Sequence, residues 1–232
     1  TSTGAGGMTG SVAGSSWTNA VNSTLNIAGP VLATGTLTAT AAPNTVNYNG
    51  AVAQTIKATT YHHLTVSTGG TKTAAAALTV NGDVTIGAGA TLALGTFSHS
   101  FKGNFTNNGA LTASTSTVTL NGSAAQSISG SSATSFNNLT INNASGISLS
   151  RAVTVTATLT FTSGNVTTGA NTLSSTGSVS RTSGHVVGNF QKNIATGATS
   201  RTFEIGDASN YTPVSVVFGS VTVAGNLTAS TA

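Results

Sequence analysis

Carboxylates are the side chains that hydrolytic chemistry needs most often, and this chain has three of them: Asp83, Glu204 and Asp207. Cleavage of polysaccharides relies on paired carboxylates, or on carboxylate clusters that bind Ca²⁺ beside a basic group. Asp83 stands alone in an Asn-Gly-Asp turn. Glu204 and Asp207 are close in sequence and lie beside Arg201. We expect these residues to tie a loop through a salt bridge and an Asx turn, with a weak cation site as the alternative.

Histidines offer a second kind of chemistry, metal binding. His62 and His63 are adjacent, but neighbouring strand residues face opposite sides of a sheet, so both cannot readily bind one ion. We expect them to be exposed polar residues at a corner. His99 and His185 stand alone, without the acidic partner or the G-x-S-x-G elbow of a nucleophilic triad. The chain has no cysteine, so we expect no disulfide, no thiolate metal site and no thiol redox chemistry. Together with the isolated acids and histidines, this predicts no enzyme, no metal site and no cofactor.

An internal duplication is the strongest signal in the sequence. The segment that begins near Thr45 is repeated from Ser116 onward. Val46 matches Val118, and after a short insertion in the second copy Leu64 matches Leu139. The chain is therefore built from related units rather than from one irregular domain.

A finer spacing of about 20 residues runs through the second copy, which is the range of a solenoid repeat. Three interleaved apolar ladders share it: Leu139, Leu159 and Val179; Ile147, Val166 and Val186; and Val153, Leu173 and Ile194. The first copy follows the same spacing in part, at Leu64, Val84 and Phe105 and at Leu92 and Leu111. Such ladders predict an all-β parallel β-helix (β-solenoid) with about 20 residues and three short strands per coil, and roughly eleven coils in total.

Asn-Gly pairs favour a rival fold, antiparallel β-sandwich repeats, because Asn-Gly between alternating runs is a strong hairpin signal. The pairs begin at Asn49, Asn81, Asn108 and Asn121. Sandwich strands would recur at intervals of about 8 to 12 residues. The ladders instead return after about 20 residues, as solenoid coils do. We therefore interpret Asn-Gly as left-handed corners between the faces of a coil. Asn-Asn pairs near Asn107, Asn137 and Asn142 are expected to form amide ladders along the stack.

Composition limits the functional classes. Thr and Ser make up 75 of the 232 residues, the charged fraction is 4%, and the net charge is +4. The seven Lys and Arg residues are scattered, so there is no basic patch for nucleic acid. No apolar run reaches the 18 or so residues of a membrane span. Three parts are expected: a Gly/Ser/Thr-rich segment over 1–16, a solenoid over 17–184 and a less regular β segment over 185–232. The first is a candidate inter-subunit strand.

Nearly all of the chain from Thr45 onward carries a resemblance to a known group. Solenoid coils containing Asn-Leu-Thr-Ile lead into a segment of the form F-x-I-G-D…N-Y-T-P-V, made here by Phe203, Ile205, Gly206, Asp207, Asn210, Tyr211, Thr212, Pro213 and Val214. In this the chain resembles the β-solenoid repeat regions of secreted bacterial cell-surface and adhesin-like proteins. The resemblance implies an extracellular or cell-surface location, after removal of a signal peptide. It attaches no catalytic residue to the motif.

A match between an internal segment and a segment near the C-terminus suggests a function. The segment Gly225 to Thr231 repeats Gly109 to Thr115, so we expect the last coil to be uncapped and to stack on another copy. The main hypothesis is thus a non-catalytic extracellular structural protein that self-associates head to tail into a filament. We expect Trp17 to be a buried anchor of the first coil. The candidate assembly residues are Trp17, Val221, Val223 and Leu227.

Two other functions stay open. The chain could be the stalk or glycan-binding segment of a surface adhesin, which predicts a monomer that binds surface glycans. An ice-binding face of Thr-x-Thr pairs is the third hypothesis. It is disfavoured because the pairs, such as those within Thr115 to Thr119 and Thr154 to Thr160, do not fall once per coil in register in the sequence.

Overall fold

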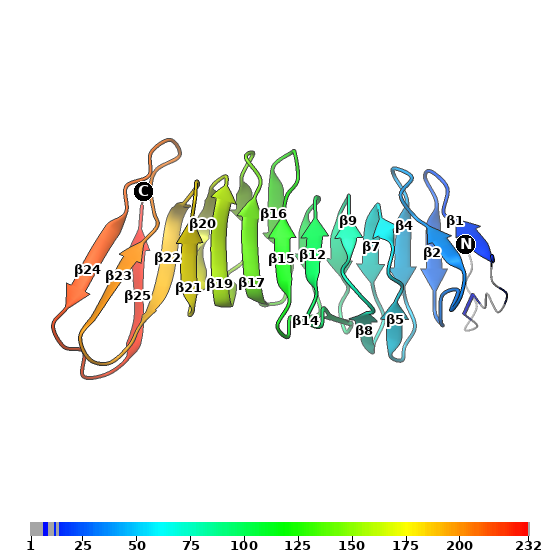
Figure 1. The fold of residues 1–232 in the computed structure, drawn as a ribbon, viewed down its shortest axis with the longest axis horizontal. Coiled ribbons are helices and arrows are strands. Elements are labelled where there is room, and N and C mark those ends of the chain that lie inside the picture. The colour runs from blue at the N-terminus through cyan, green and yellow to red at the C-terminus, as the bar shows by residue number, and fades with distance from the viewer. Residues whose placement is uncertain (1–6, 9–11, 13, 232) are drawn as a thin grey trace.

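The computed structural model describes residues 7, 8, 12 and 14–231, and all regular structure in these residues is β-strand. The strands stack into a parallel β-solenoid of about nine turns with about 20 residues per turn. Figure 1 shows the stack as an elongated rod, with the first strands at one end and the last strands at the other. The predicted β-solenoid is therefore confirmed. It has fewer turns than the eleven expected, because the chain leaves the coil after Ile194.

The strands stack in three columns. Two of them, here called the first and the third, run along most of the rod. The first contains β2 (Thr24–Ile27), β4 (Thr45–Tyr48), β7 (His63–Val66), β10 (Val84–Ile86), β13 (Phe105–Asn107), β16 (Gln126–Ser129), β18 (Ile147–Leu149) and the first residues of β20 (Val166–Ser175) and β22 (Val186–Ile194). The third column contains β1 (Ser16–Thr18), β3 (Thr36–Thr38), β6 (Thr60–Tyr61), β9 (Thr79–Val80), β12 (Ser98–Phe101), β15 (Thr117–Leu120), the second halves of β17 (Thr134–Asn142) and β19 (Val153–Ser163), and β21 (Ser178–Arg181).

The second column lies between these two along the chain. It begins with a four-stranded sheet made of β5 (Gln54–Ile56), β8 (Thr71–Ala74), β11 (Thr91–Ala93) and β14 (Ala110–Thr112). It continues with the first halves of β17 and β19 and the second halves of β20 and β22. Each full turn thus contributes one short strand to each of the three columns.

The predicted apolar ladders are real backbone neighbours, with one exception. Leu139, Leu159 and Val179 pair in succession in the third column, and Ile147, Val166 and Val186 pair in the first. Val153 pairs with Leu173, but Leu173 pairs with Phe190 and not with the predicted Ile194. Register shifts between β20 and β22 shorten this turn, which a constant period could not reveal.

The core is a continuous stack of inward-facing apolar side chains. Strand residues alternate between buried and exposed positions, as in the buried-polar-buried pattern of most strands. Aromatic rings stack along the rod: the ring centroids of Phe101 and Phe105 are 6.0 Å apart, and those of Phe105 and Phe136 are 5.4 Å apart. The hydroxyls of buried Tyr48 and Tyr61 lie 2.9 Å apart and bond the backbone of Lys57. Burial of such rings is a major stabilising term.

The two copies of the duplicated unit occupy different columns. Val46 lies in the first column, whereas its sequence match Val118 lies in the third. The offset between the copies is not a whole number of turns, each of about 20 residues, so the second copy starts part of a turn further round. The same sequence unit therefore serves different faces of the rod.

Equivalent glutamines form the same corner in both copies. The side-chain oxygen of Gln54 accepts from the Gly50 N–H, and its amide donates to the Ile27 and Gly29 carbonyls. In the second copy Gln126 accepts from the Gly122 N–H and donates to the Phe101 and Gly103 carbonyls. These sets supply partners to backbone groups that turn away from the strand ladders, where burial without a partner would be costly.

The interpretation of Asn-Gly as left-handed corners is wrong. Gly50, Gly82, Gly109 and Gly122 are absent from the residues with positive φ. Glycine is required there because a Cβ would lie 2.3–2.7 Å from atoms of the preceding coil, such as the Ala28 carbonyl oxygen for Gly50 and the Lys102 carbonyl oxygen for Gly122. Close approach of the preceding coil, rather than turn conformation, selects these glycines. The close atoms are backbone oxygens at Gly50, Gly109 and Gly122 and the His63 ring at Gly82.

Polar ladders along the stack are mixed rather than purely Asn. Asn47 donates to the Asn26 side chain at 2.9 Å and accepts from the Ser67 hydroxyl. The three asparagines that were predicted to stack on one another bond other partners: Asn107 bonds Ala133 and Thr134, Asn137 bonds Thr156 and Asn138, and Asn142 bonds Ser163.

The C-terminal end of the rod is closed by a change of strand direction. β23 (Thr199–Phe203) and β24 (Val214–Phe218) form an antiparallel hairpin, and β25 (Gly225–Ser230) pairs antiparallel with β22. Figure 1 shows these strands at one end of the stack. The expected continuation of the coil at Gly225 to Thr231 is therefore wrong. Its sequence counterpart, the β14 region, pairs in parallel with β11, so the same motif is used in two orientations.

The predicted solenoid segment ends at Gly184, whereas the parallel stack continues past this residue into β22. Most of the predicted N-terminal segment lies outside the described residues. In its described part, Met8 donates to the Pro30 carbonyl and accepts from the Leu32 N–H of its own chain.

Candidate functional site

The acidic residues near the C-terminal end hold structure together. The Glu204 carboxylate lies 2.6 Å from Nζ of Lys192, and both side chains are largely buried. Lys192 also donates to the Thr202 carbonyl at 2.6 Å and lies over the ring of Phe190. Burial lowers the pKa of Lys192, although the Glu204 carboxylate acts in the opposite direction. The ion pair thus ties β22 to Glu204, the residue that directly follows β23.

The predicted partners in this segment are only partly correct. The salt bridge to Glu204 comes from Lys192 and not from Arg201, which donates to the Asn193 and Ser200 carbonyls instead. Asp207 forms the predicted Asx turn, accepting from the Ser209 and Asn210 N–H groups at 2.7 Å. Hydrogen bonds from Asn210 and Ser209 lower the pKa of Asp207. The carboxylate is thereby engaged by its own loop.

The resemblance motif closes the end of the first column. Phe203 and Ile205 are buried, and Ile205 forms a parallel bridge with Val186. The guanidinium carbon of Arg181 lies 3.4 Å from the ring centroid of Tyr211, a cation–π contact. His185 bonds the Asp207 carbonyl at 2.7 Å. The segment therefore covers the C-terminal end of the solenoid core.

His63 and Asp83 form the candidate site on the side of the rod. Nδ1 of His63 accepts from the Asp83 N–H at 2.9 Å and lies 3.7 Å from the Asp83 carboxylate. These residues line a shallow depression of about 280 Å³ with Thr45, Thr65 and Thr85. The other oxygen of Asp83 accepts from the Asn104 N–H. Both groups therefore stabilise the stacking of β7, β10 and the following coil.

The paired histidines differ from expectation. The rings of His62 and His63 do not point to opposite sides, because their centroids are 4.2 Å apart. Burial lowers the pKa of His62, and the neighbouring His63 acts in the same direction. Among the residues that the structure describes, no three His, Asp or Glu side chains come together as a metal site would require.

Lys72 is a buried cation that the sequence analysis missed. It lies at an inward position of β8, between Gln54 of β5 in the preceding coil and Leu92 of β11 in the following coil. Its ammonium group donates to the Gly50, Thr68 and Gly69 carbonyls. Burial lowers the pKa of Lys72. Alternation in Thr-Lys-Thr-Ala could have revealed the inward position, since Lys72 falls in phase with Ala74.

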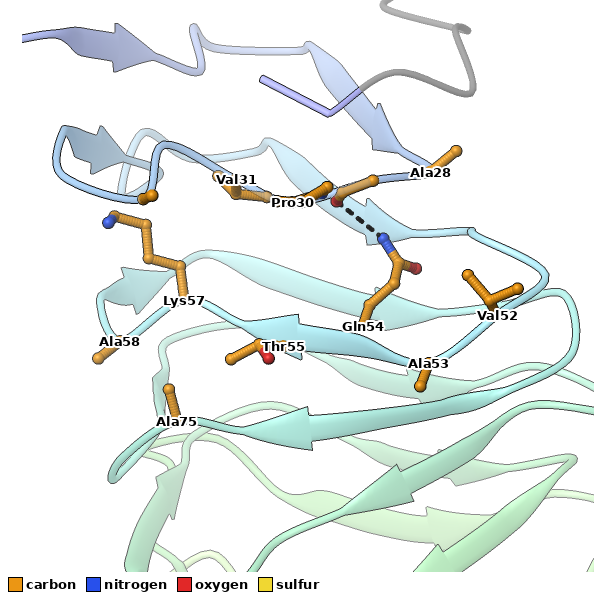
Figure 2. A pocket seen from close by; sticks show the side chains of 12 residues that line it. Ala28, Pro30, Val31, Val52, Ala53, Gln54, Thr55, Lys57, Ala58 and Ala75 are labelled. Atoms are coloured by element: carbon orange, nitrogen blue, oxygen red, sulfur yellow. Dashed lines mark hydrogen bonds between the residues drawn. The ribbon is translucent and has the colours of Figure 1, made fainter. Parts of the chain in front are cut away.

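A larger hollow lies beside β5 at the N-terminal end of the rod. It has a volume of about 560 Å³, which is within the range of ligand pockets. Figure 2 shows that residues 28–33 pass over β5 and that Gln54 reaches across to them. Two polar side chains in its wall already bond the backbone: Gln54 bonds the Gly29 carbonyl and Lys57 bonds the Leu32 carbonyl. The remaining wall is made mainly of Ala, Val, Gly and Pro.

The candidate assembly residues lie at both ends of the rod. Trp17 is on β1 and is 42% exposed, so the expected buried anchor is wrong. Val223 is 80% exposed in the loop before β25, whereas Val221 and Leu227 are half-buried. Leu227 packs against the core from β25.

Polar side chains, mostly hydroxyls, form two in-register rows on the third column, although Thr-x-Thr itself occurs on only two of its five strands here, β15 and β19, as expected. We call this surface the hydroxyl face. It consists of the outward residues of β12, β15, β17, β19 and β21: Ser98, Ser100, Thr117, Thr119, Asn138, Thr140, Thr158, Thr160, Ser178 and Ser180. The register is not evident from the sequence because Ser and Asn replace Thr in three of the five strands.

Comparisons with known proteins add no relative: no family model, no curated protein and no solved structure matches the chain. Within residues 7, 8, 12 and 14–231, no helix has the length and apolar character needed to cross a membrane.

Replacement of Lys192 tests whether the acidic cluster is structural. Lys192→Met leaves the Glu204 carboxylate buried without its cation, which typically costs about 3–5 kcal/mol. We expect that loss in the free energy of unfolding, measured with urea, and a smaller loss in Lys192→Met/Glu204→Gln. Lys102→Met, at an exposed position, should change stability by less than about 0.5 kcal/mol. Equal effects at Lys192 and Lys102 would contradict the structural role.

The pH dependence of stability tests the role of His99. Nδ1 of His99 accepts from the Leu78 N–H at 3.1 Å, and Nε2 lies 3.0 Å from the Leu94 carbonyl, so the ring is neutral. Burial lowers the pKa of His99 below its ordinary 6.5. The unfolded chain therefore binds the proton first as pH falls, and stability should decrease from pH 7 to pH 5.

His99→Phe should lose about 1–3 kcal/mol at pH 7, because the Leu78 N–H is left unpaired. It should also show a weaker decline in stability between pH 7 and pH 5 in urea unfolding. An unchanged decline in the variant would assign the acid sensitivity elsewhere.

Proposed function

We propose that this chain is a non-catalytic structural protein of the extracellular space or cell surface, whose rods associate end to end into a filament. The observation that carries the proposal is the position of exposed apolar residues. Among the described residues, six of the seven large hydrophobic side chains that are exposed lie near the two ends of the rod: Val12, Trp17, Val21, Val214, Val217 and Val223. Clustered exposed apolar residues are typical of interaction surfaces.

Free strand edges lie at the same two ends. β2 is the first strand of its column and pairs with β4 alone among the described residues, and β1 pairs with β3 alone. At the other end, β24 pairs with β23 and β25 pairs with β22. Such edges are templates for pairing with another chain. A contact between different ends does not close on itself and therefore generates a filament.

This contact differs from the one that the sequence suggested. The C-terminal end is covered by β25 and the hairpin, so a second copy would meet the exposed valines of β24 and of the loop before β25. About nine turns at about 4.8 Å each give a stack roughly 40 Å long. Each added rod would lengthen the filament by at least this distance.

The use of the polar side chains supports a non-catalytic role. Glu204, Asp207, Asp83 and Lys72 each bond backbone or a neighbouring side chain that holds the coil together. The resemblance of the segment around Phe203 to cell-surface repeat proteins supports the proposed location.

Substitutions at the C-terminal end test the association. We expect the wild-type protein to form particles of increasing length with concentration, seen by electron microscopy and light scattering. Val217→Lys/Val223→Lys should raise the concentration needed for assembly by at least about tenfold, which corresponds to 1.4 kcal/mol. Ala133→Lys/Ala152→Lys is the matched control, because both residues are exposed in the middle of the rod, between β16 and β17 and between β18 and β19.

A wild-type protein that stays monomeric at all concentrations would contradict the filament. It would favour the alternative, a stalk segment of a surface adhesin. An equal effect of Ala133→Lys/Ala152→Lys would show that added charge, and not loss of the end contact, prevents assembly.

A further inference from the structure

The hydroxyl face is a regular two-dimensional array. Its inner row, Ser100, Thr119, Thr140, Thr160 and Ser180, is extended by Thr79 and Thr60 over two more coils. Neighbouring strands of a sheet are about 4.8 Å apart, and alternate residues of one strand are about 6.8 Å apart. Parallel pairing without a register shift within these rows fixes both spacings. Figure 1 shows β9, β12, β15, β17, β19 and β21 following one another along the rod.

Four of the five threonine hydroxyls in this array are free to bind something outside the protein, whereas the Ser100 hydroxyl donates to the Asn121 side chain at 2.9 Å. Those of Thr117, Thr119, Thr140 and Thr160 form no hydrogen bond with any residue in the described part of the chain. Thr158 and Ser178 bond each other at 3.2 Å, so their spacing is also held. β-Branched threonine has few rotamers in a strand. Little side-chain entropy is therefore lost when the row binds a regular partner.

The chemistry of the face is neutral. Nine of its ten residues are Ser or Thr and the tenth is Asn138. The face contains no acidic, basic or aromatic side chain. The other columns lack such an array. In the second column alanine interrupts both rows, at Ala93 and Ala110, and in the first column His63 interrupts the row that contains Thr45.

We propose that the hydroxyl face binds ice. Its two spacings are close to oxygen repeats on the surfaces of hexagonal ice, so successive hydroxyls can replace or anchor lattice waters while the threonine methyl groups fill the gaps between them. A charged face would bind disordered water strongly and oppose this match. A crystalline polysaccharide is the other regular hydroxylated partner, but its sugar rings are usually bound by exposed aromatic side chains, which the face lacks. This activity is independent of end-to-end association.

Bulky substitutions in the inner row provide the test. The wild-type protein should slow ice recrystallisation and accumulate on a growing ice crystal when fluorescently labelled. Thr119→Tyr/Thr140→Tyr should reduce both effects at least tenfold, because two adjacent rungs no longer fit a lattice. The control Thr73→Tyr/Thr112→Tyr places the same residues on exposed positions of β8 and β14 and should keep full activity. Circular dichroism and the melting temperature should verify that both variants fold.

Three results would overturn the proposal. The wild-type protein could fail to bind ice, or the control variant could lose as much activity as the variant of the hydroxyl face. Sedimentation with microcrystalline cellulose provides the third: retention that Thr119→Tyr/Thr140→Tyr abolishes, without ice binding, would assign the face to a crystalline polysaccharide.

Discussion

Parallel backbone pairing between successive turns is the constraint from which the rest of the structure follows. Each strand bonds its counterparts in the preceding and the following turn, so side chains at equivalent positions stack along the rod. Most inward positions are therefore apolar, which gives the continuous core from Leu25 to Ile205. Where backbones come closest, as at Gly109 and Gly122, even a methyl group would not fit.

The same constraint explains the unusual use of polar residues. Every coil bends between its three strands, and each bend removes backbone groups from the ladders. Gln54, Gln126 and Lys72 supply buried partners for these groups. Outward positions need β propensity without like charges stacked at about 4.8 Å, and Thr and Ser meet both needs. The near absence of charge and the hydroxyl face therefore have one physical origin.

The stacking of regular turns could be predicted from the sequence, whereas changes in turn length and in strand direction could not. Leu139, Leu159 and Val179 could be aligned because each turn between them has the same length. Ile194 was misassigned because bulges in β20 shorten the next turn. The antiparallel return of β25 could not be predicted, since its sequence matches a parallel segment near Gly109. Asp207 could be placed from its local turn chemistry, whereas the partner of Glu204 lies on a different strand.

Cysteine cross-linking tests the parallel register most directly, because the chain has no cysteine of its own. Thr119, Thr140 and Thr160 are successive partners in the third column. Thr119→Cys/Thr140→Cys places Cα atoms within the 4.4–6.8 Å that a disulfide spans, whereas Thr119→Cys/Thr160→Cys separates them by about twice the strand spacing. The register predicts rapid intramolecular oxidation of the first pair and none of the second. Oxidation of the second pair, or failure of the first in the folded protein, would contradict the stacked coil.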